Sequence, residues 1–376
     1  MRKTGTYERL GSINYFIPDA LPPTEPPLIM HEQIGMLYGE AMHELGKLNE
    51  MAHRLPDAHR FIKAYIIKEA LLTSAIEGVH TTLIDVFTQP LLGSKPEKDL
   101  QLVMNYTKAL DAALSMIRVE VLPIVTQVMC KAHEILMHYG AGDKSDPGNF
   151  RRQSVMVGNL VPPPAMKIPD LMSDLERYIN LDETMPPLIK AGLAHVQFET
   201  IHPFLDGNGR MGRLLIVLML IDNGLLLEPI LYLSYYFKKH HFDYYHALDR
   251  VRTHGDFEGW ITFYLHAIKE TSIDAYRRAK DIEQLTQNLT AKINNSTWSQ
   301  NKKESRLLAL SILFSYPVID ASMLSRQLKV AYNTARNIID DLIELNILVA
   351  QPEQKRGQLF RFVAYLEALE FEYDDV

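Results

Sequence analysis

Cysteine is almost absent from this sequence of 376 residues, which contains only Cys130. A single thiol excludes an intrachain disulfide, and chains without disulfides are typical of reducing compartments. The apolar segment from Leu214 to Ile221 is far shorter than the ~20 residues with which a helix spans a bilayer. The first residues, Met1 to Gly5, lead into no apolar segment of the kind that secretory signals contain. We therefore expect a cytoplasmic protein with no membrane partner.

Positive charge is also in short supply. Lysine and arginine number 39 against 46 aspartate and glutamate residues, which gives a net charge of −7. This balance argues against a general binder of nucleic acids or of anionic membranes. Hydrophobic residues, by contrast, make up 47% of the chain, which is enough for large cores, and the length suggests two or three domains.

The most informative segment runs from His202 to Arg213 and reads HPFLDGNGRMGR. Its middle, Asp206 to Gly209, favours a tight turn, because Gly and Asn tolerate the positive φ that such a turn needs. The residues that follow, Leu214 to Ile221, are apolar on every side, as in a buried helix. A loop that enters a helix presents unpaired backbone N–H groups and a partial positive charge, which together attract a phosphate.

Two arginines, Arg210 and Arg213, are three residues apart, so we expect them in the first turn of this helix and on one face. Cations at that end oppose the helix dipole by about 0.3–1 kcal/mol each, which indicates that an anion binds there. His202 precedes the loop, where it can accept a proton from a hydroxyl near neutral pH. Asp206 lies between them, where a carboxylate can hold Mg²⁺ against phosphate oxygens. The residues alone therefore indicate phosphoryl or nucleotidyl transfer.

The same twelve residues resemble, position for position, the signature of the Fic family: His, any residue, Phe, two more, Gly-Asn-Gly-Arg, two more, Arg. The resemblance implies a mainly α fold, a Fic-type helical bundle with a small β-hairpin flap. It also implies transfer of AMP from ATP to a Ser, Thr or Tyr hydroxyl of target proteins and of the protein itself. By this resemblance His202 would be the catalytic base and Asp206 the Mg²⁺ ligand. The Gly-Asn-Gly form differs from the Doc-type kinases of the family, in which Lys replaces the second Gly.

The resemblance further implies contacts with ATP in three places. The signature would hold the phosphates through Gly207, Asn208, Gly209, Arg210, Met211, Gly212 and Arg213. The flap would border the nucleotide through Val157, Gly158, Asn159 and Leu160. Tyr244, the first of a Tyr-Tyr pair in a segment similar to the C-terminal helices of Fic proteins, would line the nucleoside pocket.

A glutamate stands at another unfavourable helix end. The apolar spacing predicts a helix over His59 to Glu77, ended by Gly78. Taken alone, Glu77 is most simply a solvated residue in a fraying turn, although a carboxylate there opposes the dipole. The segment from Thr73 to Gly78 nevertheless resembles the inhibitory motif of Fic proteins. That match implies that Glu77 pairs with Arg213, displaces the γ-phosphate and makes the protein an autoinhibited member of the class whose inhibitory motif is N-terminal.

Residues 154–161 have a different character, with β-favouring residues around Gly158-Asn159, which predicts a hairpin. An ordinary surface hairpin is one interpretation. The resemblance implies instead a flap that binds the target protein by main-chain pairing with an extended peptide.

A zinc site is an alternative interpretation of His195, Glu199 and His202, which are spaced as on one helical face. Pro203 directly follows His202, however, and pushes it out of helical geometry. No third histidine or water-activating glutamate follows at the spacing of zinc proteases. We therefore interpret His195 as a packed or hydrogen-bonded helix residue.

Composition and the resemblance to Fic proteins together divide the chain into six expected parts. Residues 1–30 are rich in proline and predict an extended arm, residues 31–100 a helical region with the inhibitory motif, and residues 101–290 the catalytic core. A polar linker over 291–301 precedes a winged helix-turn-helix domain over 302–366, and an acidic tail covers 367–376.

The winged-helix prediction depends on helices at about 303–315, 321–328 and 332–345 and on two strands within 349–363. Duplex DNA would be contacted by Tyr332, Asn333, Arg336, Lys355 and Arg356. Acidic residues follow closely, whereas DNA contact needs several cations that neutralise phosphates. We favour a module for protein association, with a homo-oligomer expected and DNA binding as the alternative. The second function that the sequence allows is accordingly a nucleotide-sensing transcriptional regulator without transferase activity.

Overall fold

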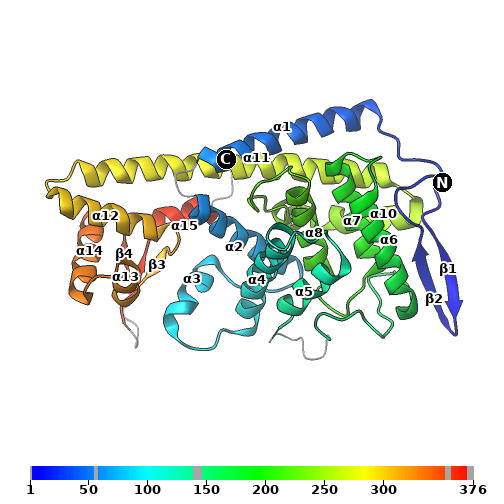
Figure 1. Cartoon of the computed structure of the whole chain (residues 1–376), viewed down its shortest axis with the longest axis horizontal. Coiled ribbons are helices and arrows are strands. Elements are labelled where there is room, and N and C mark those ends of the chain that lie inside the picture. The colour runs from blue at the N-terminus through cyan, green and yellow to red at the C-terminus, as the bar shows by residue number, and fades with distance from the viewer. Residues whose placement is uncertain (1, 55–57, 139–145, 352–356, 371–376) are drawn as a thin grey trace.

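The computed structural model describes residues 2–54, 58–138, 146–351 and 357–370, and within these ranges the chain is mainly helical, as predicted (Figure 1). The first helices are α1 (Glu32–Arg54), α2 (Ala58–Ile76), α3 (Leu83–Leu92) and α4 (Lys98–Arg118). They are followed by α5 (Thr126–Leu136), α6 (Ile168–Leu181), α7 (Pro187–Ile201), α8 (Asn208–Asp222), α9 (Ser234–Lys239), α10 (His241–His254) and α11 (Phe257–Asn294). The boundary expected between residues 100 and 101 falls inside α4.

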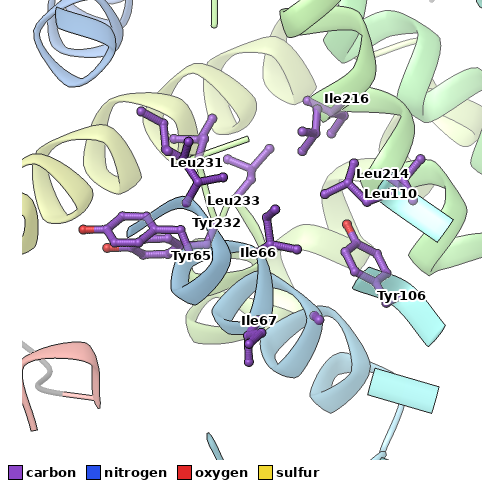
Figure 2. Close-up of a cluster of buried hydrophobic side chains, with 14 of the residues drawn as sticks. Tyr65, Ile66, Ile67, Tyr106, Leu110, Leu214, Ile216, Leu231, Tyr232 and Leu233 are labelled. Atoms are coloured by element: carbon purple, nitrogen blue, oxygen red, sulfur yellow. The ribbon is translucent and has the colours of Figure 1, made fainter. Parts of the chain in front are cut away.

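Helix α8 lies at the centre of the bundle because its sequence offers no polar face. Every residue from Leu214 to Leu220 is at most 2% exposed, and the helix contacts α2, α4, α5 and α7. Figure 2 shows part of this core, where Leu214 and Ile216 of α8 lie across from Ile66 of α2. Burying each such side chain contributes about 1.5–3 kcal/mol. The predicted buried helix is confirmed, although it begins at Asn208, so that Arg213 lies in its second turn rather than its first.

The N-terminal arm is not wholly extended, which corrects our prediction. Strands β1 (Gly5–Leu10) and β2 (Ile13–Pro18) form an antiparallel hairpin in which Leu10 pairs with Ile13. Gly11 makes the turn with φ +63°, a conformation that glycine adopts without steric cost. The prolines that suggested an extended arm begin only where β2 ends, so they do not disturb the strands.

Helix α11 is 38 residues long and carries both parts of the structure. At about 1.5 Å per residue it measures about 57 Å. It contacts α1, α7, α9 and α10 of the bundle and α12 and α15 of the C-terminal unit (Figure 1). The expected linker at 291–301 is therefore shorter than predicted, because the helix continues to Asn294 and the next one begins at Gln300.

The C-terminal unit contains α12 (Gln300–Leu313), α13 (Ala321–Leu328), α14 (Tyr332–Glu344) and α15 (Val363–Glu370). Its short strands β3 (Val318–Ile319), β4 (Val349–Ala350) and β5 (Phe360–Arg361) form an antiparallel sheet in the order β3-β5-β4. The three predicted helices are present, while the winged-helix assignment stays a prediction. Residues 367–370 belong to α15 rather than to a tail, and Lys355, Arg356 and residues 371–376 lie outside the described residues.

In the described residues, no helix combines the length and the hydropathy needed to cross a membrane.

Candidate active site

The predicted catalytic loop connects α7 to α8. Helix α7 ends at Ile201, and His202 takes the left-handed conformation with φ 50° and ψ 61°. Proline at 203 disfavours helical geometry at His202, as expected from the sequence. A non-glycine residue with positive φ is uncommon, and strained positions of this kind concentrate at functional sites. The zinc face proposed for His195, Glu199 and His202 is therefore interrupted at its last member.

The loop closes on itself through Asn208. The Asn208 Oδ1 atom accepts from the backbone N–H of Phe204 at 2.9 Å, and its Nδ2 donates to the Phe204 carbonyl at 2.9 Å. Gly207 precedes α8 with φ +80°, and its N–H donates to Asp206 Oδ1 at 2.6 Å. The Asn208 side chain is thus occupied in bracing the loop, so any contact with phosphate from this residue must come from its backbone N–H. Met211 is fully buried, and its backbone N–H already donates to the Gly207 carbonyl at 3.0 Å.

Two residues from other segments of the chain contact the catalytic loop, and sequence reasoning missed both. The buried His133 ring stacks on Phe204, with centroids 3.7 Å apart, and its Nε2 lies 2.9 Å from the Asp206 carbonyl oxygen. Arg151 is 1% exposed and donates from Nε to the His202 carbonyl at 2.8 Å and from Nη2 to the Pro163 carbonyl at 2.6 Å. These are contacts with backbone carbonyls far away in sequence, which no local pattern announces.

The electrostatic surroundings of His202 favour its neutral form. Burial and the nearby Arg151 guanidinium lower the pKa of His202 to about 4. Its Nδ1 atom is buried without a hydrogen-bond partner in the described residues. The imidazole is therefore uncharged at neutral pH and has a lone pair available for a proton.

The surroundings of Arg210 fit an anion best. It is 3% exposed, and its Nε and Nη1 have no hydrogen-bond partner among the described residues. Its Nη2 lies 3.5 Å from Asp206 Oδ1 and 3.6 Å from Met137 Sδ. Buried guanidinium donors without partners are costly, so the arrangement fits a ligand that carries several oxygen acceptors. The Asp206 side chain, 53% exposed, faces the same region and fits a hydrated Mg²⁺.

Arg213 contacts the predicted inhibitory residues. Its Nη2 lies 2.6 Å from Glu77 Oε1, its Nε donates to Thr73 Oγ1 at 2.7 Å, and its Nη2 also donates to the Thr73 carbonyl at 3.1 Å. Burial works against the Glu77 carboxylate, but the charge of Arg213 holds the pKa of Glu77 below its usual value. A Cβ atom on Gly209 would lie 2.3 Å from Glu77 Oε1. Glycine at 209 is thus what leaves room for this pair.

Buried polar side chains of α7 and α10 pack beside α8. His195 Nε2 lies 2.9 Å from the Tyr244 hydroxyl, and burial lowers the pKa of His195 to about 3. Burial also raises the pKa of Glu199 to about 7. A Cβ atom on Gly212 would lie 2.3 Å from Glu199 Oε1, so glycine is required where α8 passes over this carboxyl. The interpretation of His195 as a hydrogen-bonded helix residue is confirmed.

Tyr244 is buried, and its predicted contact with the nucleoside stays a prediction. Its side chain is 1% exposed and stacks on Phe237 with centroids 4.5 Å apart. The neighbouring Tyr245 is 41% exposed, and the charges of Glu77 and Arg213 act on its hydroxyl. One step along α10 turns the side chain by ~100°, which separates the buried tyrosine from the accessible one.

The predicted flap forms a tight turn. Val157 and Leu160 exchange two backbone hydrogen bonds of 2.9 Å around Gly158 and Asn159. Within the described residues of the flap, this isolated bridge does not extend into a ladder of further pairs. The N-terminal hairpin supports this segment: the Phe16 N–H donates to the Val161 carbonyl at 2.9 Å, and the Tyr15 hydroxyl lies 2.5 Å from Ser154 Oγ. Arg151 ties the flap to the catalytic loop through Pro163 and His202.

Comparison with known proteins agrees with this site. The pattern of the Fic/DOC family matches residues 123–220, and that of the Fic/DOC family N-terminal region matches residues 36–115. The protein adenylyltransferase Fic of Drosophila erecta is 31% identical over 208 residues, and that of Drosophila melanogaster is 30% identical over 208 residues. Both alignments cover 54% of this chain and 40% of the relative, so the chain spans about two fifths of the length of these relatives.

A solved structure shows the same fold. A Fic family protein from Desulfovibrio desulfuricans G20 aligns with a TM-score of 0.58 at 23% sequence identity. The alignment covers 90% of this chain and 98% of the other. This structure shows a shared fold, while the sequence similarity to the Fic/DOC family covers residues 36–115 and 123–220.

Proposed function

We propose that the protein is an adenylyltransferase that moves AMP from ATP to a hydroxyl side chain of target proteins and of itself. The observation that carries the proposal is that one loop has a neutral His202 at its start and, just after it in α8, an Arg210 whose buried Nε and Nη1 have no partner in the described residues. A base and an anion site are the two parts that such a transfer needs. The printed names of the Drosophila relatives support the same reaction class.

The chemistry follows from the arrangement of these residues. The imidazole of His202 accepts the proton of the target hydroxyl, whose oxygen attacks the α-phosphorus of ATP. The bond from that phosphorus to the bridging oxygen breaks, and pyrophosphate leaves with the negative charge. Backbone N–H groups at the start of α8, including those of Asn208 and Gly209, stabilise the charge on the phosphoryl oxygens, and Arg210 holds the outer phosphates.

A magnesium ion would fit beside Arg210. Asp206 would hold Mg²⁺, and the ion would supply charge neutralisation for the phosphates when bound. Tyr245, the exposed member of the Tyr-Tyr pair, would also lie beside the nucleoside.

The contact between Glu77 and Arg213 supports autoinhibition. As long as Arg213 is bound to Glu77 and Thr73, two of its three nitrogens are occupied and it is not free to bind the γ-phosphate. ATP would then bind in a pose that does not allow in-line attack. In the inhibited state the enzyme is thus folded and complete, and only one charge pair separates it from activity.

The flap around 154–161 is our proposed site for the target peptide, since Arg151 ties the segment that follows it to His202 and an extended peptide can pair with such a hairpin by its main chain. A single cysteine suits the cytoplasm, where we propose that the reaction takes place. For the C-terminal unit we propose protein association, most simply a homo-oligomer. Arg336 supports this over DNA binding, because it is already engaged by Asp340 at 3.3 Å and Gln358 at 3.2 Å.

Mass spectrometry tests the proposal directly. Glu77→Gly protein is incubated with Mg²⁺ and ATP carrying a label in the α-phosphate, and tryptic peptides are searched for a mass increase of one AMP unit. Label on hydroxyl side chains of the protein itself, absent when His202→Ala is introduced as well, is the expected result. ATP binding without any covalent label would favour the nucleotide-sensing regulator instead.

A further inference from the structure

A cavity of about 510 Å³ lies between the helical bundle and the C-terminal unit. Helices α2, α3 and α4 form three of its walls, and Tyr316 and Met323 of the C-terminal unit form the fourth. In Figure 1, α3 lies beside this unit, and it contacts both β3 and α15. None of the lining residues belongs to the catalytic loop, so the cavity is separate from the proposed active site.

The cavity is lined along one face of α4. Six residues of α4 line it, at positions 104, 107, 108, 111, 114 and 118, which is the spacing of one helical face. From Met104 to Arg118 the helix rises by about 21 Å at 1.5 Å per residue. A volume of about 510 Å³ spread over that length makes a narrow slot, which suits an extended chain better than a bulky ring system.

Apolar side chains form most of the walls. Those of α2 and α3 include Ile62, Ile66, Val86, Phe87 and Leu91, and α4 adds Met104 and Leu114. The volume falls in the range of ~300–1,000 Å³ that is usual for small-molecule sites, and such sites combine apolar walls with a few convergent polar groups. The composition of the slot thus fits an occupant that is largely hydrocarbon.

The polar groups of the slot carry an excess of positive charge. Arg118 is paired with Glu228 at 3.3 Å, which leaves Lys63, Lys108 and Asp111. Lys63 lies with its Nζ 4.5 Å from the ring centroid of Tyr316, and burial lowers the pKa of Lys63 and raises the pKa of Asp111. Two lysines against one carboxylate leave one positive charge, so a single negative charge on a ligand would complete the set.

We propose that this slot binds an elongated apolar molecule that ends in one anionic group, with the chemistry of a medium-length fatty carboxylate. The hydrocarbon lies along α4 against Phe87 and Met104, and the anionic end is held by Lys63 and Lys108. This site is independent of the proposed transferase reaction, although α2, which forms one of its walls, is also the helix that leads to Glu77.

Calorimetric titration of the full-length protein with decanoate tests the inference, at concentrations below those at which decanoate forms micelles. Decylamine, with the same hydrocarbon and the opposite charge, is the comparison ligand. We expect saturable binding of one decanoate, and binding of decylamine at least ten-fold weaker. Absence of saturable decanoate binding, or equal affinity for the two ligands, would overturn the proposal.

Variants separate the two halves of the site. Lys63→Gln combined with Lys108→Gln should weaken decanoate at least ten-fold without weakening decylamine, whereas Lys98→Gln, an exposed lysine at the start of α4 outside the slot, should change neither. Met104→Trp should weaken both ligands by filling the slot, and Met104→Phe serves if the tryptophan variant does not fold, as judged by circular dichroism. Unchanged decanoate binding in the double lysine variant would refute the assigned site.

Discussion

Removing the Glu77 carboxylate is the perturbation that probes the structure most directly. In Glu77→Gly, Arg213 loses its partner at 2.6 Å and becomes available to the nucleotide. Transfer of AMP, including self-modification, should therefore rise. The backbone should tolerate the change, because Glu77 follows the last residue of α2 and precedes Gly78 in a turn.

The size of the effect follows from the burial of the pair. Exposed ion pairs contribute about 0–1 kcal/mol, but the Arg213 side chain is 1% exposed and that of Glu77 is 32% exposed. A hydrogen bond to a charged group is worth about 1.5–3 kcal/mol, and this is the cost that the wild-type protein meets when it frees Arg213. At about 1.4 kcal/mol per decade, the rate should rise roughly ten- to hundred-fold.

Parallel transfer assays on the wild type and four variants decide the matter. Glu77→Gln should be intermediate, because the amide oxygen still accepts a hydrogen bond from Arg213 but carries no charge. Arg213→Ala should not be activated, since it removes the phosphate ligand together with the inhibitory contact, and the double variant should resemble Arg213→Ala. Equal rates for wild type and Glu77→Gly would refute the inhibitory role, while the transferase proposal would be judged separately by the His202 variants.

Three further predictions concern the base and the C-terminal unit. His202→Ala in the Glu77→Gly background should reduce transfer more than ten-fold and leave ATP binding intact. His202→Asn should do the same with an unchanged melting temperature, because Asn tolerates positive φ. Retained transfer in these variants would exclude His202 as the base. Because the pKa of His202 is lowered to about 4, the base stays neutral on acidification, and kcat/KM of Glu77→Gly should remain level from pH 8 to pH 5.5. A fall of kcat/KM with a midpoint near pH 6.5 would contradict the burial argument. Deleting residues 302–376 should lower the oligomer mass in light scattering and leave self-modification of Glu77→Gly largely unchanged; duplex DNA binding by the full chain that weakens steeply with salt would instead support the regulator.

Local sequence was sufficient for the catalytic loop because its parts are neighbours in the chain. Asp206 to Gly209 contain the turn residues, Pro203 sets the geometry of His202, and the apolar run after Arg213 makes α8 a buried helix. Each of these features depends on backbone preferences and on the burial of one helix, which a single stretch of sequence encodes.

Long-range contacts were not accessible in the same way. Arg151 and His133 hold the loop through backbone carbonyls, and a carbonyl leaves no trace in the identity of the residue that bears it. The pairing of Glu77 with Arg213 spans 136 positions and was expected from the family resemblance rather than from spacing. The burial of Tyr244 beside an exposed Tyr245 was not predicted, because a rotation of one residue about α10 decides whether a side chain faces the core or the solvent.

The length of α11 has a mechanical consequence for the whole chain. Its first turn holds Arg2 through Glu258 at 2.8 Å, and about four turns before its end the buried Arg278 donates to the carbonyls of Ala368 at 3.2 Å and Leu369 at 3.3 Å. The first and the last described segments of the chain are therefore both bound to α11. Neither segment can detach without exposing part of α11, so the bundle and the C-terminal unit are coupled in their unfolding. Heating should therefore unfold them in one transition rather than one after the other.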